Sequence, residues 1–377
     1  MKLIFINGSR GEWGYIKPII DLCKQKSIKY SICATNMLLL PAHGNLLKEI
    51  IDAGYNVSDQ IYMSLEGHNH LSMSKSLSIF MSSFTDTLAR EKPDWIVCAG
   101  DRGEQLMATI CGSYTYTPVA HIQAGERSGN IDGVARHAIG KLAHLHFAAN
   151  KDAEERLIKS GEEPSRIHNV GAPQLDEMIK EEIPSKEKTL KKLSLPSNKD
   201  YLLCVHHPVT EEVGSSYQNM KNLISALNRF DLTKIIILPN NDAGSYQTRR
   251  AILENRKSDI YLFDNLTRKY YLSLLKNCRA IIGNSSSGLL EAPTYKIPAL
   301  NIGKRQLNRV QGDNVLNCSN EEKQIQDGIE KVISKKFRSQ LINIKNPYGD
   351  GKSSERIIKI LESYKIDSKL LIKKITY

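Results

Sequence analysis

Two stretches in the first half of the chain gather acidic and basic side chains in short polar segments. One reads AGDRGEQ, and the other, HIQAGERSGNIDGVARHAIGKLAHLH, covers residues 121–146. Carboxylates at the ends of neighbouring strands can move a proton, work that typically contributes about 10²- to 10⁴-fold in rate. The candidates for this chemistry are Asp101, Arg102, Glu104, Glu126, Asp132 and Arg136.

The longer stretch predicts a helix over residues 131–142. An apolar set that begins with Ile131 and Val134 recurs at spacings of three or four, whereas Asp132 and Arg136 lie one turn apart on another face. The pair can be an ordinary (i, i+4) ion pair near a helix N-terminus, worth a few tenths of a kcal/mol. It can equally belong to a site for proton transfer.

A serine- and glycine-rich turn, GNSSSGLLEAP, covers residues 283–293 in the second half of the chain. It follows an apolar run and leads into a helical pattern, so Ser285 and Ser286 can offer hydroxyls and amides to an anion such as a phosphate. The alternative is plain capping of the helix, for which serine is favoured. Glu291, farther along, either reaches a ribose hydroxyl or points to water.

Further polar turns follow other apolar runs. NGSRGEWG holds Arg10 among three glycines, but it matches neither a GxGxxG fingerprint nor a Walker loop. HHPVT places His207 directly after a predicted strand, either to donate to a phosphate oxygen or as a structural histidine. The turns PNNDAG and GKRQLNR add Asn240, Asp242, Arg305 and Arg309. The convergence of these turns supports an anion site more than any one of them does.

The elements that must position these turns alternate along the chain. Short apolar runs such as LIFIN and WIVCAG are followed by amphipathic segments, which predicts βαβ units around a parallel sheet. Pro18 is expected in the first turn of the first helix. Charges crowd between prolines over residues 177–200, which indicates a domain linker, and the pattern then restarts. We therefore expect two Rossmann-like α/β domains, 1–178 and 190–357, with the polar turns facing a cleft between them.

Composition excludes several classes of function. The 377 residues carry a net charge of +11, which attracts anions, but the lysines form no stripe with interleaved aromatics of the kind that binds nucleic acid. The seven cysteines form no CxxC pair, and the histidines in GHNH and HLH have no further ligand at a metal-site spacing, so we expect no disulfide framework, metal or cofactor. No stretch approaches the ~18 apolar residues of a membrane span. A cytoplasmic location is expected.

Six motifs occur in an order and spacing that match one known family. They read GDRGEQL, HIQAGERSGNIDGVARHAIGKLAHLHFAAN, HHPVT, LPNNDAGS, IGNSSSGLLEAP and NIGKRQLNR. Through them the chain resembles the hydrolysing UDP-N-acetylglucosamine 2-epimerases of sialic-acid and legionaminic-acid synthesis. The resemblance implies a glycosyltransferase-B type fold, a nucleotide held mainly by the second domain, and a C-terminal helix, 358–377, that packs back on the first. It also implies a reaction that eliminates UDP to a glycal and hydrates the glycal to the free 2-epimer.

The resemblance assigns roles residue by residue. Asp101 and Asp132 match acidic positions that the family uses, and proton transfer falls to Asp101, Asp132 or Glu126. The residues expected to bind the substrate are Arg10, Arg102, Gln123, Arg136, His207, Asn240, Ser285, Ser286, Glu291 and Arg305.

Three positions depart from the family pattern. Gln123 stands where the family usually has Glu, and an amide cannot act as a carboxylate base. Gly133 replaces a frequent second acid, and Leu38 replaces a frequent His. The substrate is therefore either UDP-N-acetylglucosamine or its 2,4-diacetamido-2,4,6-trideoxy analogue.

Other functions stay open at this point. A non-hydrolysing UDP-sugar 2-epimerase and a glycosyltransferase share the expected architecture, and a non-enzymatic anion or nucleic-acid binder would rest on the net charge alone. The expected partner is the nucleotide sugar, without nucleic acid or membrane, in a homo-oligomer that is a dimer or a tetramer.

Overall fold

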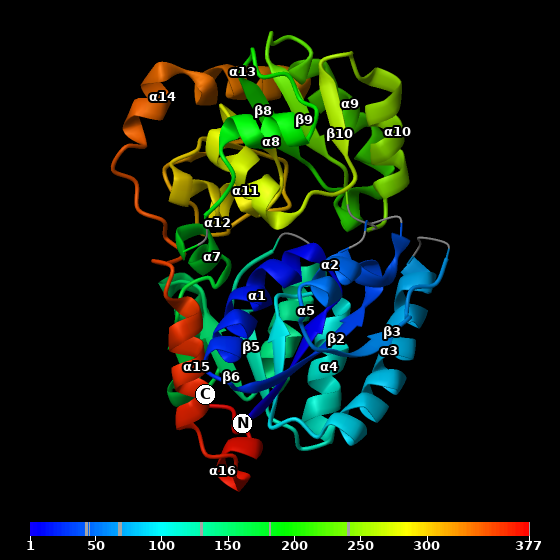
Figure 1. Cartoon of the computed structure of the whole chain (residues 1–377), viewed down its shortest axis with the longest axis vertical. Helices are drawn as coiled ribbons and strands as arrows, with labels where there is room; N and C mark the ends of the chain where they lie inside the picture. The colour runs from blue at the N-terminus through cyan, green and yellow to red at the C-terminus, as the bar shows by residue number, and fades with distance from the viewer. Residues whose placement is uncertain are drawn as a thin grey trace. The chain divides into compact units, whose positions relative to one another are not determined.

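The computed structural model describes residues 1–41, 44, 46–66, 70–128, 131–180, 182–239 and 242–376 (Figure 1). The chain forms two compact units. Unit 1 contains Met1–Arg127, Ile131–Lys180 and Tyr348–Tyr377, and unit 2 contains Glu181–Pro347 together with Ser128–Asn130.

Unit 1 is built on a parallel sheet in the order β3-β2-β1-β4-β5-β6-β7. Its strands are β1 (Lys2–Asn7), β2 (Lys29–Thr35), β3 (Val57–Ile61), β4 (Trp95–Ala99), β5 (Val119–Ala124), β6 (Leu145–Ala148) and β7 (Ile167–Asn169). Its helices are α1 (Arg10–Gln25), η1 (Asn36–Leu39), α2 (Leu46–Asp52), α3 (His70–Glu91), α4 (Gly103–Tyr114), α5 (Ile131–Leu142), α6 (Lys151–Lys159), η3 (Pro164–Arg166), α7 (Gln174–Lys180), α15 (Ser353–Ser363) and α16 (Ser368–Leu371).

Unit 2 repeats the architecture with a parallel sheet in the order β10-β9-β8-β11-β12-β13. Its strands are β8 (Tyr201–Val205), β9 (Thr233–Ile237), β10 (Ile260–Phe263), β11 (Ala280–Gly283), β12 (Ala299–Ile302) and β13 (Val315–Cys318). Its helices are α8 (Lys186–Lys192), η4 (Thr210–Ser215), α9 (Ser216–Leu227), α10 (Ser245–Asn255), α11 (Arg268–Asn277), α12 (Ser287–Leu290), η5 (Ala292–Tyr295), α13 (Glu322–Ile333) and α14 (Lys335–Gln340). The prediction of two parallel-sheet α/β domains is confirmed.

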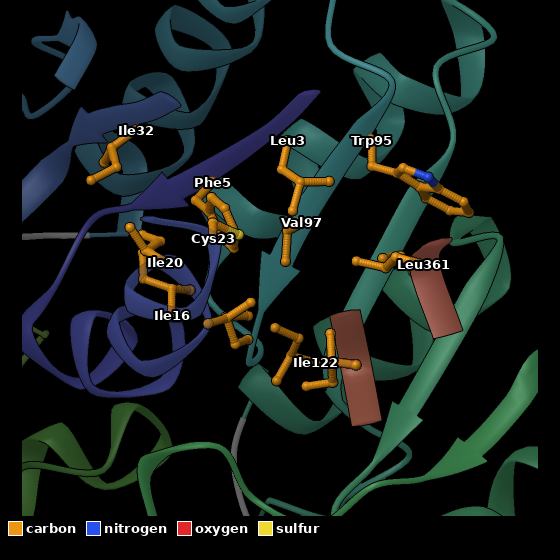
Figure 2. Packing of buried hydrophobic residues seen from close by; sticks show 14 of the residues in the cluster. Leu3, Phe5, Ile16, Ile20, Cys23, Ile32, Trp95, Val97, Ile122 and Leu361 are labelled. Carbon is orange, nitrogen blue, oxygen red and sulfur yellow. The ribbon is translucent and has the colours of Figure 1, made fainter. Parts of the chain in front are cut away.

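Both faces of the unit 1 sheet are covered, which explains why its strands read as apolar runs. Because side chains alternate along β1, Leu3 and Phe5 pack on the face of α1 and α15, while Ile4 and Ile6 pack on the face of α3 and α4. Figure 2 shows the first of these layers, with α1 contributing to the core together with Leu361 of α15. The sheet is therefore a rigid platform for the loops at its edges.

The last segment of the chain belongs to unit 1, where α15 lies beside α1 (Figure 1). Asp176 in α7 caps this helix, because its carboxylate oxygens accept hydrogen bonds from the backbone amides of Ser353 (3.0 Å) and Ser354 (2.7 Å). Gly171, with φ +85°, packs against the backbone of Tyr348, where a Cβ would lie 3.1 Å from the carbonyl oxygen.

Two local predictions were wrong. Pro18 lies inside α1 rather than in its first turn, because the helix already begins at Arg10, where the Ser9 Oγ accepts from the amide of Glu12. The stretch 177–200 is not a linker throughout, since it contains α8, whose Leu190 is buried in the core of unit 2. No helix among the residues that the structure describes is long and apolar enough to cross a membrane.

Candidate active site

In unit 1, charged and amide side chains cluster beyond the carboxyl ends of the strands. Arg10 is the first residue of α1, after β1, and Asp101 and Arg102 lie between β4 and α4. Glu126 follows β5, and Asp132 sits half-buried in the first turn of α5. In a parallel sheet all these loops lie at one edge, which is where ligands bind in open α/β sheets.

Arg136 joins two of these loops. Its guanidinium forms an ion pair with Asp101 through Nη2 and donates from Nη1 to the backbone carbonyl of Gln123 at 2.7 Å. Only 4% of Arg136 is exposed. The structure therefore brings three predicted site residues, Asp101, Gln123 and Arg136, into one buried network.

Gln123 occupies an unusual backbone position. Its φ of +62° lies in the left-handed region, and the pairing of β5 with β6 shifts register between Ile122 and Ala124. The amide nitrogen makes a long hydrogen bond of 3.4 Å to Gln174, whereas the buried Oε1 has no hydrogen-bond partner among the described residues. Such strain and an orphaned polar atom are found at functional sites more often than elsewhere.

Glu126 is buried beside the start of α6. Its Oε1 accepts a hydrogen bond of 2.5 Å from Asn150, the residue that caps α6. The preceding Gly125 has φ +74°, and a Cβ there would lie 2.4 Å from the carbonyl oxygen of Ala153. Only glycine allows this loop to approach α6 so closely, which fixes the position of the Glu126 carboxylate.

His121 supports the loop that carries Asp101. Its Nε2 lies 2.7 Å from the carbonyl oxygen of Gly100. A carbonyl only accepts, so Nε2 carries the proton of a neutral imidazole. Burial lowers the pKa of His121 to about 3, and the ring stays neutral at physiological pH.

Sequence reasoning missed a group of buried polar residues next to these loops. Glu12 accepts hydrogen bonds from the Gly8 amide at 2.6 Å and from the Gln105 side chain at 2.8 Å. Glu104, noted for proton transfer, instead accepts from Asn36 at 3.1 Å and from Arg102 Nε at 3.2 Å. A glutamate in the first turn of a helix normally looks like a solvated, dipole-favoured residue, so the sequence carries no signal for this burial.

Arg10 is another cation at this edge of unit 1. Burial lowers the pKa of its guanidinium to about 10, while the charge of Glu49 opposes the shift. The side chain stays protonated at neutral pH, so its positive charge can attract an anionic ligand.

In unit 2, Asn284 links the loops that carry His207 and Arg305. Its side chain accepts from the His207 amide and donates to the His207 carbonyl, both at 2.8 Å. The carbonyl oxygen of Asn284 accepts from Arg305 Nη1 at 3.2 Å. Arg305 Nε is buried without a hydrogen-bond partner among the described residues. We call these contacts of Asn284 with His207 and Arg305 the Asn284 joint. Gly283 makes this joint possible, since its φ is +133° and a Cβ would lie 2.2 Å from the carbonyl oxygen of Val205.

The serine turn, residues 283–293, offers less to an anion than the sequence predicts. Ser286 stands at the N-cap position of α12 but makes no side-chain capping hydrogen bond, and this helix has only four residues, Ser287–Leu290, so its dipole adds little to an anion site. Ser285 is half-buried, and its Oγ accepts from the Ser287 amide at 3.3 Å. Glu291 is buried, pairs with Arg268 at 2.6 Å and accepts from Ser287 Oγ.

A small pocket, partly open to solvent, lies beside Asn284 within unit 2. His207 and Lys304 line it, together with His206, whose pKa burial lowers to about 4. The predicted Asn240 lies outside the described residues. The described part of the chain contains no group of three or more His, Cys, Asp or Glu residues that could hold a metal ion.

Known proteins resemble this chain over most of its length. The family model for UDP-N-acetylglucosamine 2-epimerase matches residues 21–362. The chain is 33% identical over 374 residues to the UDP-N,N'-diacetylbacillosamine 2-epimerase (hydrolyzing) of Legionella pneumophila, covering 99% of this chain and 98% of that protein. It is also 33% identical over 344 residues to the GDP/UDP-N,N'-diacetylbacillosamine 2-epimerase (hydrolyzing) of Campylobacter jejuni, covering 89% and 88%.

Solved structures give the same fold. The UDP-GlcNAc 2-epimerase from Neisseria meningitidis, bound to UDP-GlcNAc, is similar with a TM-score of 0.80 at 20% identity, covering 97% of this chain and 100% of that one. The expected glycosyltransferase-B type fold is therefore confirmed. Because the family model spans most of the sequence and the two relatives share a third of the aligned residues, the chain belongs to the UDP-N-acetylglucosamine 2-epimerase family.

Proposed function

We propose that this protein is a hydrolysing 2-epimerase that acts on a UDP-N-acetylhexosamine. The observation that carries the proposal is the 33% identity, over nearly the full length, to a relative whose name specifies hydrolysis of UDP-N,N'-diacetylbacillosamine. The substrate is UDP-N-acetylglucosamine or its 2,4-diacetamido-2,4,6-trideoxy analogue. A cytoplasmic location and a dimeric or tetrameric state stay predictions.

The proposed reaction has two stages. A base removes the proton from carbon 2 of the sugar, the electron pair forms the carbon 1–carbon 2 double bond, and the bond from carbon 1 to UDP breaks. Water then adds its oxygen to carbon 1, and a proton returns to carbon 2 on the opposite face. Overall, one water is consumed, and UDP and the free manno-configured sugar are released.

Inversion at carbon 2 needs proton-transferring groups on both faces of the sugar, and the candidate carboxylates of unit 1 are Asp101, Asp132 and Glu126. A guanidinium beside a carboxylate stabilises the charged form and weakens the carboxylate as a base. Because Arg136 pairs with Asp101, the proposed role of Asp101 is to hold negative charge. Asp132 and Glu126 are then the groups that exchange protons with the substrate. Gln123 carries a neutral amide, so it does not compete with Asp132 and Glu126 for protons.

In each unit by itself, the residues proposed to contact UDP are cations and hydroxyl or amide donors. Arg10 and Arg102 neutralise the diphosphate from unit 1, and the leaving group gains charge as its bond to carbon 1 breaks. From unit 2 the proposed contacts are His207, Asn240, Ser285, Ser286, Glu291 and Arg305. The Asn284 joint supports this assignment, because it fixes the backbone of two of these residues relative to each other.

The first prediction concerns the products. Incubated with UDP-N-acetylglucosamine or with the 2,4-diacetamido analogue, the protein releases UDP and a free manno-configured sugar without any acceptor. Proton and phosphorus NMR of the mixture measure both products directly. An epimer still attached to UDP would instead identify a non-hydrolysing 2-epimerase.

A glycosyltransferase is the second candidate, because its fold type is the same as that of this chain. It requires an acceptor for turnover. Rapid release of UDP in the absence of an acceptor therefore eliminates it.

A further inference from the structure

One buried carboxylate ties together the loops that follow β1, β2 and β4. Glu104, in the first turn of α4, is only 2% exposed. Its Oε1 accepts from Asn36 Nδ2 at 3.1 Å and lies 3.2 Å from Arg102 Nε in an ion pair. Two donors from different loops thus converge on a single oxygen atom.

The loop after β1 packs directly against the same oxygen. A Cβ on Gly8 would lie 2.2 Å from Glu104 Oε1, so a side chain there would displace the carboxylate from its position. The carbonyl of Gly8 in turn accepts from the amide of Leu38 in η1 at 3.2 Å. The position of Glu104 is therefore set from three sides.

A second carboxyl group sits behind the first. Glu12 accepts from the Gly8 amide and from Gln105, which also donates to the carbonyl of Ile6 at 3.3 Å. Burial, and after it the charge of Glu104, raises the pKa of Glu12 to about 8. Glu12 therefore keeps a proton near neutral pH, and its hydrogen-bond partners are the Gly8 amide and the Gln105 side chain.

We propose that Glu104 is a positioning residue that orients the Arg102 guanidinium toward the diphosphate of the substrate. The inference rests on the proposed function, in which Arg102 binds that group. A guanidinium has five N–H donors in a rigid fork, so a carboxylate that holds Nε fixes the plane in which the terminal nitrogens meet a phosphate. Lysine could not be oriented in this way, because its ammonium group has no plane.

The test is a double-mutant cycle on UDP affinity, measured by calorimetry with the full chain. E104Q removes the charge but keeps the shape, and we expect it to weaken UDP binding by about tenfold, the size of one charge-assisted hydrogen bond. R102Q weakens UDP binding by at least as much. Because Glu104 acts through Arg102, adding E104Q to R102Q changes the affinity by less than about twofold.

Three results would overturn the proposal. E104Q alone could leave UDP affinity unchanged, it could weaken binding equally in the presence and absence of Arg102, or R102Q could bind UDP like the parent protein. Calorimetry does not depend on turnover. A protein that shows the coupling but releases no UDP from either sugar nucleotide refutes the hydrolysing epimerase and leaves the Glu104 assignment standing.

A second variant guards against misfolding of E104Q. N36G removes the other donor to Glu104 at a position with φ +50°, where glycine is unstrained, and is expected to weaken UDP binding less than E104Q does. The matched control is E91Q, which breaks an ion pair of 2.9 Å with Lys2 at the opposite end of β1 and leaves UDP affinity unchanged. During turnover, E104Q raises KM more than it lowers kcat, a split that general loss of folded protein does not produce.

Discussion

At the scale of single residues, buried imidazoles set how the protein responds to acid. Burial lowers the pKa of His121 to about 3, and those of His144, His146 and His206 to about 4. His144 accepts from the Val119 amide through Nδ1 at 3.0 Å, which only an unprotonated nitrogen can do. The native state therefore holds these rings neutral, whereas the unfolded chain protonates them near pH 6.5.

This difference predicts a loss of stability on acidification. Between pH 6.5 and about 4 these histidines bind protons in the unfolded chain but not in the folded chain. The free energy of unfolding therefore falls as pH drops. Each such histidine contributes a loss of about 2 kcal/mol between pH 7 and pH 5. H144Q keeps an acceptor for Val119 and should shrink the loss by that amount in urea unfolding at the two pH values.

The control for this experiment is S78A, at an exposed serine of α3, which removes no titratable group and should leave the difference between pH 7 and pH 5 unchanged. An H144Q protein that loses as much stability as the parent on acidification would show that His144 is not held neutral.

The position of a candidate residue could be predicted from the sequence where a polar residue follows an apolar run that forms a strand. Asp101, His207 and Ser285 satisfy both conditions. Glu12 and the role of Glu104 could not be predicted, because the burial of a carboxylate depends on partners that are distant in sequence, such as Asn36 for Glu104. The consequences of Gln123 for the chemistry depend on an orphaned oxygen that only three-dimensional packing reveals.

At the scale of elements, α5 shows how tertiary contacts override a surface pattern. The sequence predicts its range of 131–142, but not which side faces inward. Ile131 and Val134 are 52% and 67% exposed, whereas Arg136 and Gly140 are buried. The ion pair with Asp101 and the bond to the Gln123 carbonyl draw the charged face toward the sheet.

The C-terminal segment of unit 1 contains α15, and Asp176 caps this helix. Asp176→Ala leaves two buried backbone amides without the carboxylate, at a cost of about 2–3 kcal/mol in the free energy of unfolding. Urea denaturation measures this cost. D350A, which removes an exposed pairing with Arg356 at 2.8 Å, is the matched control and should cost less than about 1 kcal/mol.

Equal losses in D176A and D350A would contradict the importance of the cap. The expected difference follows from burial, because Asp176 is enclosed by protein and Asp350 is in contact with water. The cap itself has no sequence signal, since 177 positions separate Asp176 from Ser353.

At the scale of the whole molecule, the same architecture appears twice with different chemistry at its strand ends. Asp101, Arg102 and Glu126 follow strands of unit 1, while His207, Ser285 and Arg305 follow strands of unit 2. The alternation of apolar runs and amphipathic segments was enough to predict this duplication, because a parallel sheet buried on both faces demands it. In the proposed division of labour, unit 1 moves protons and neutralises the diphosphate through Arg10 and Arg102, and unit 2 holds most of the nucleotide.

The central claim, that the carboxylates of unit 1 exchange the proton at carbon 2 of the sugar, has one direct test. The protein is incubated with its UDP-sugar in heavy water, and carbon 2 of the released sugar is examined by proton NMR. We predict one deuterium at carbon 2 in every product molecule, and loss of both turnover and exchange in D132N. A released 2-epimer that retains the original hydrogen at carbon 2 would contradict the mechanism.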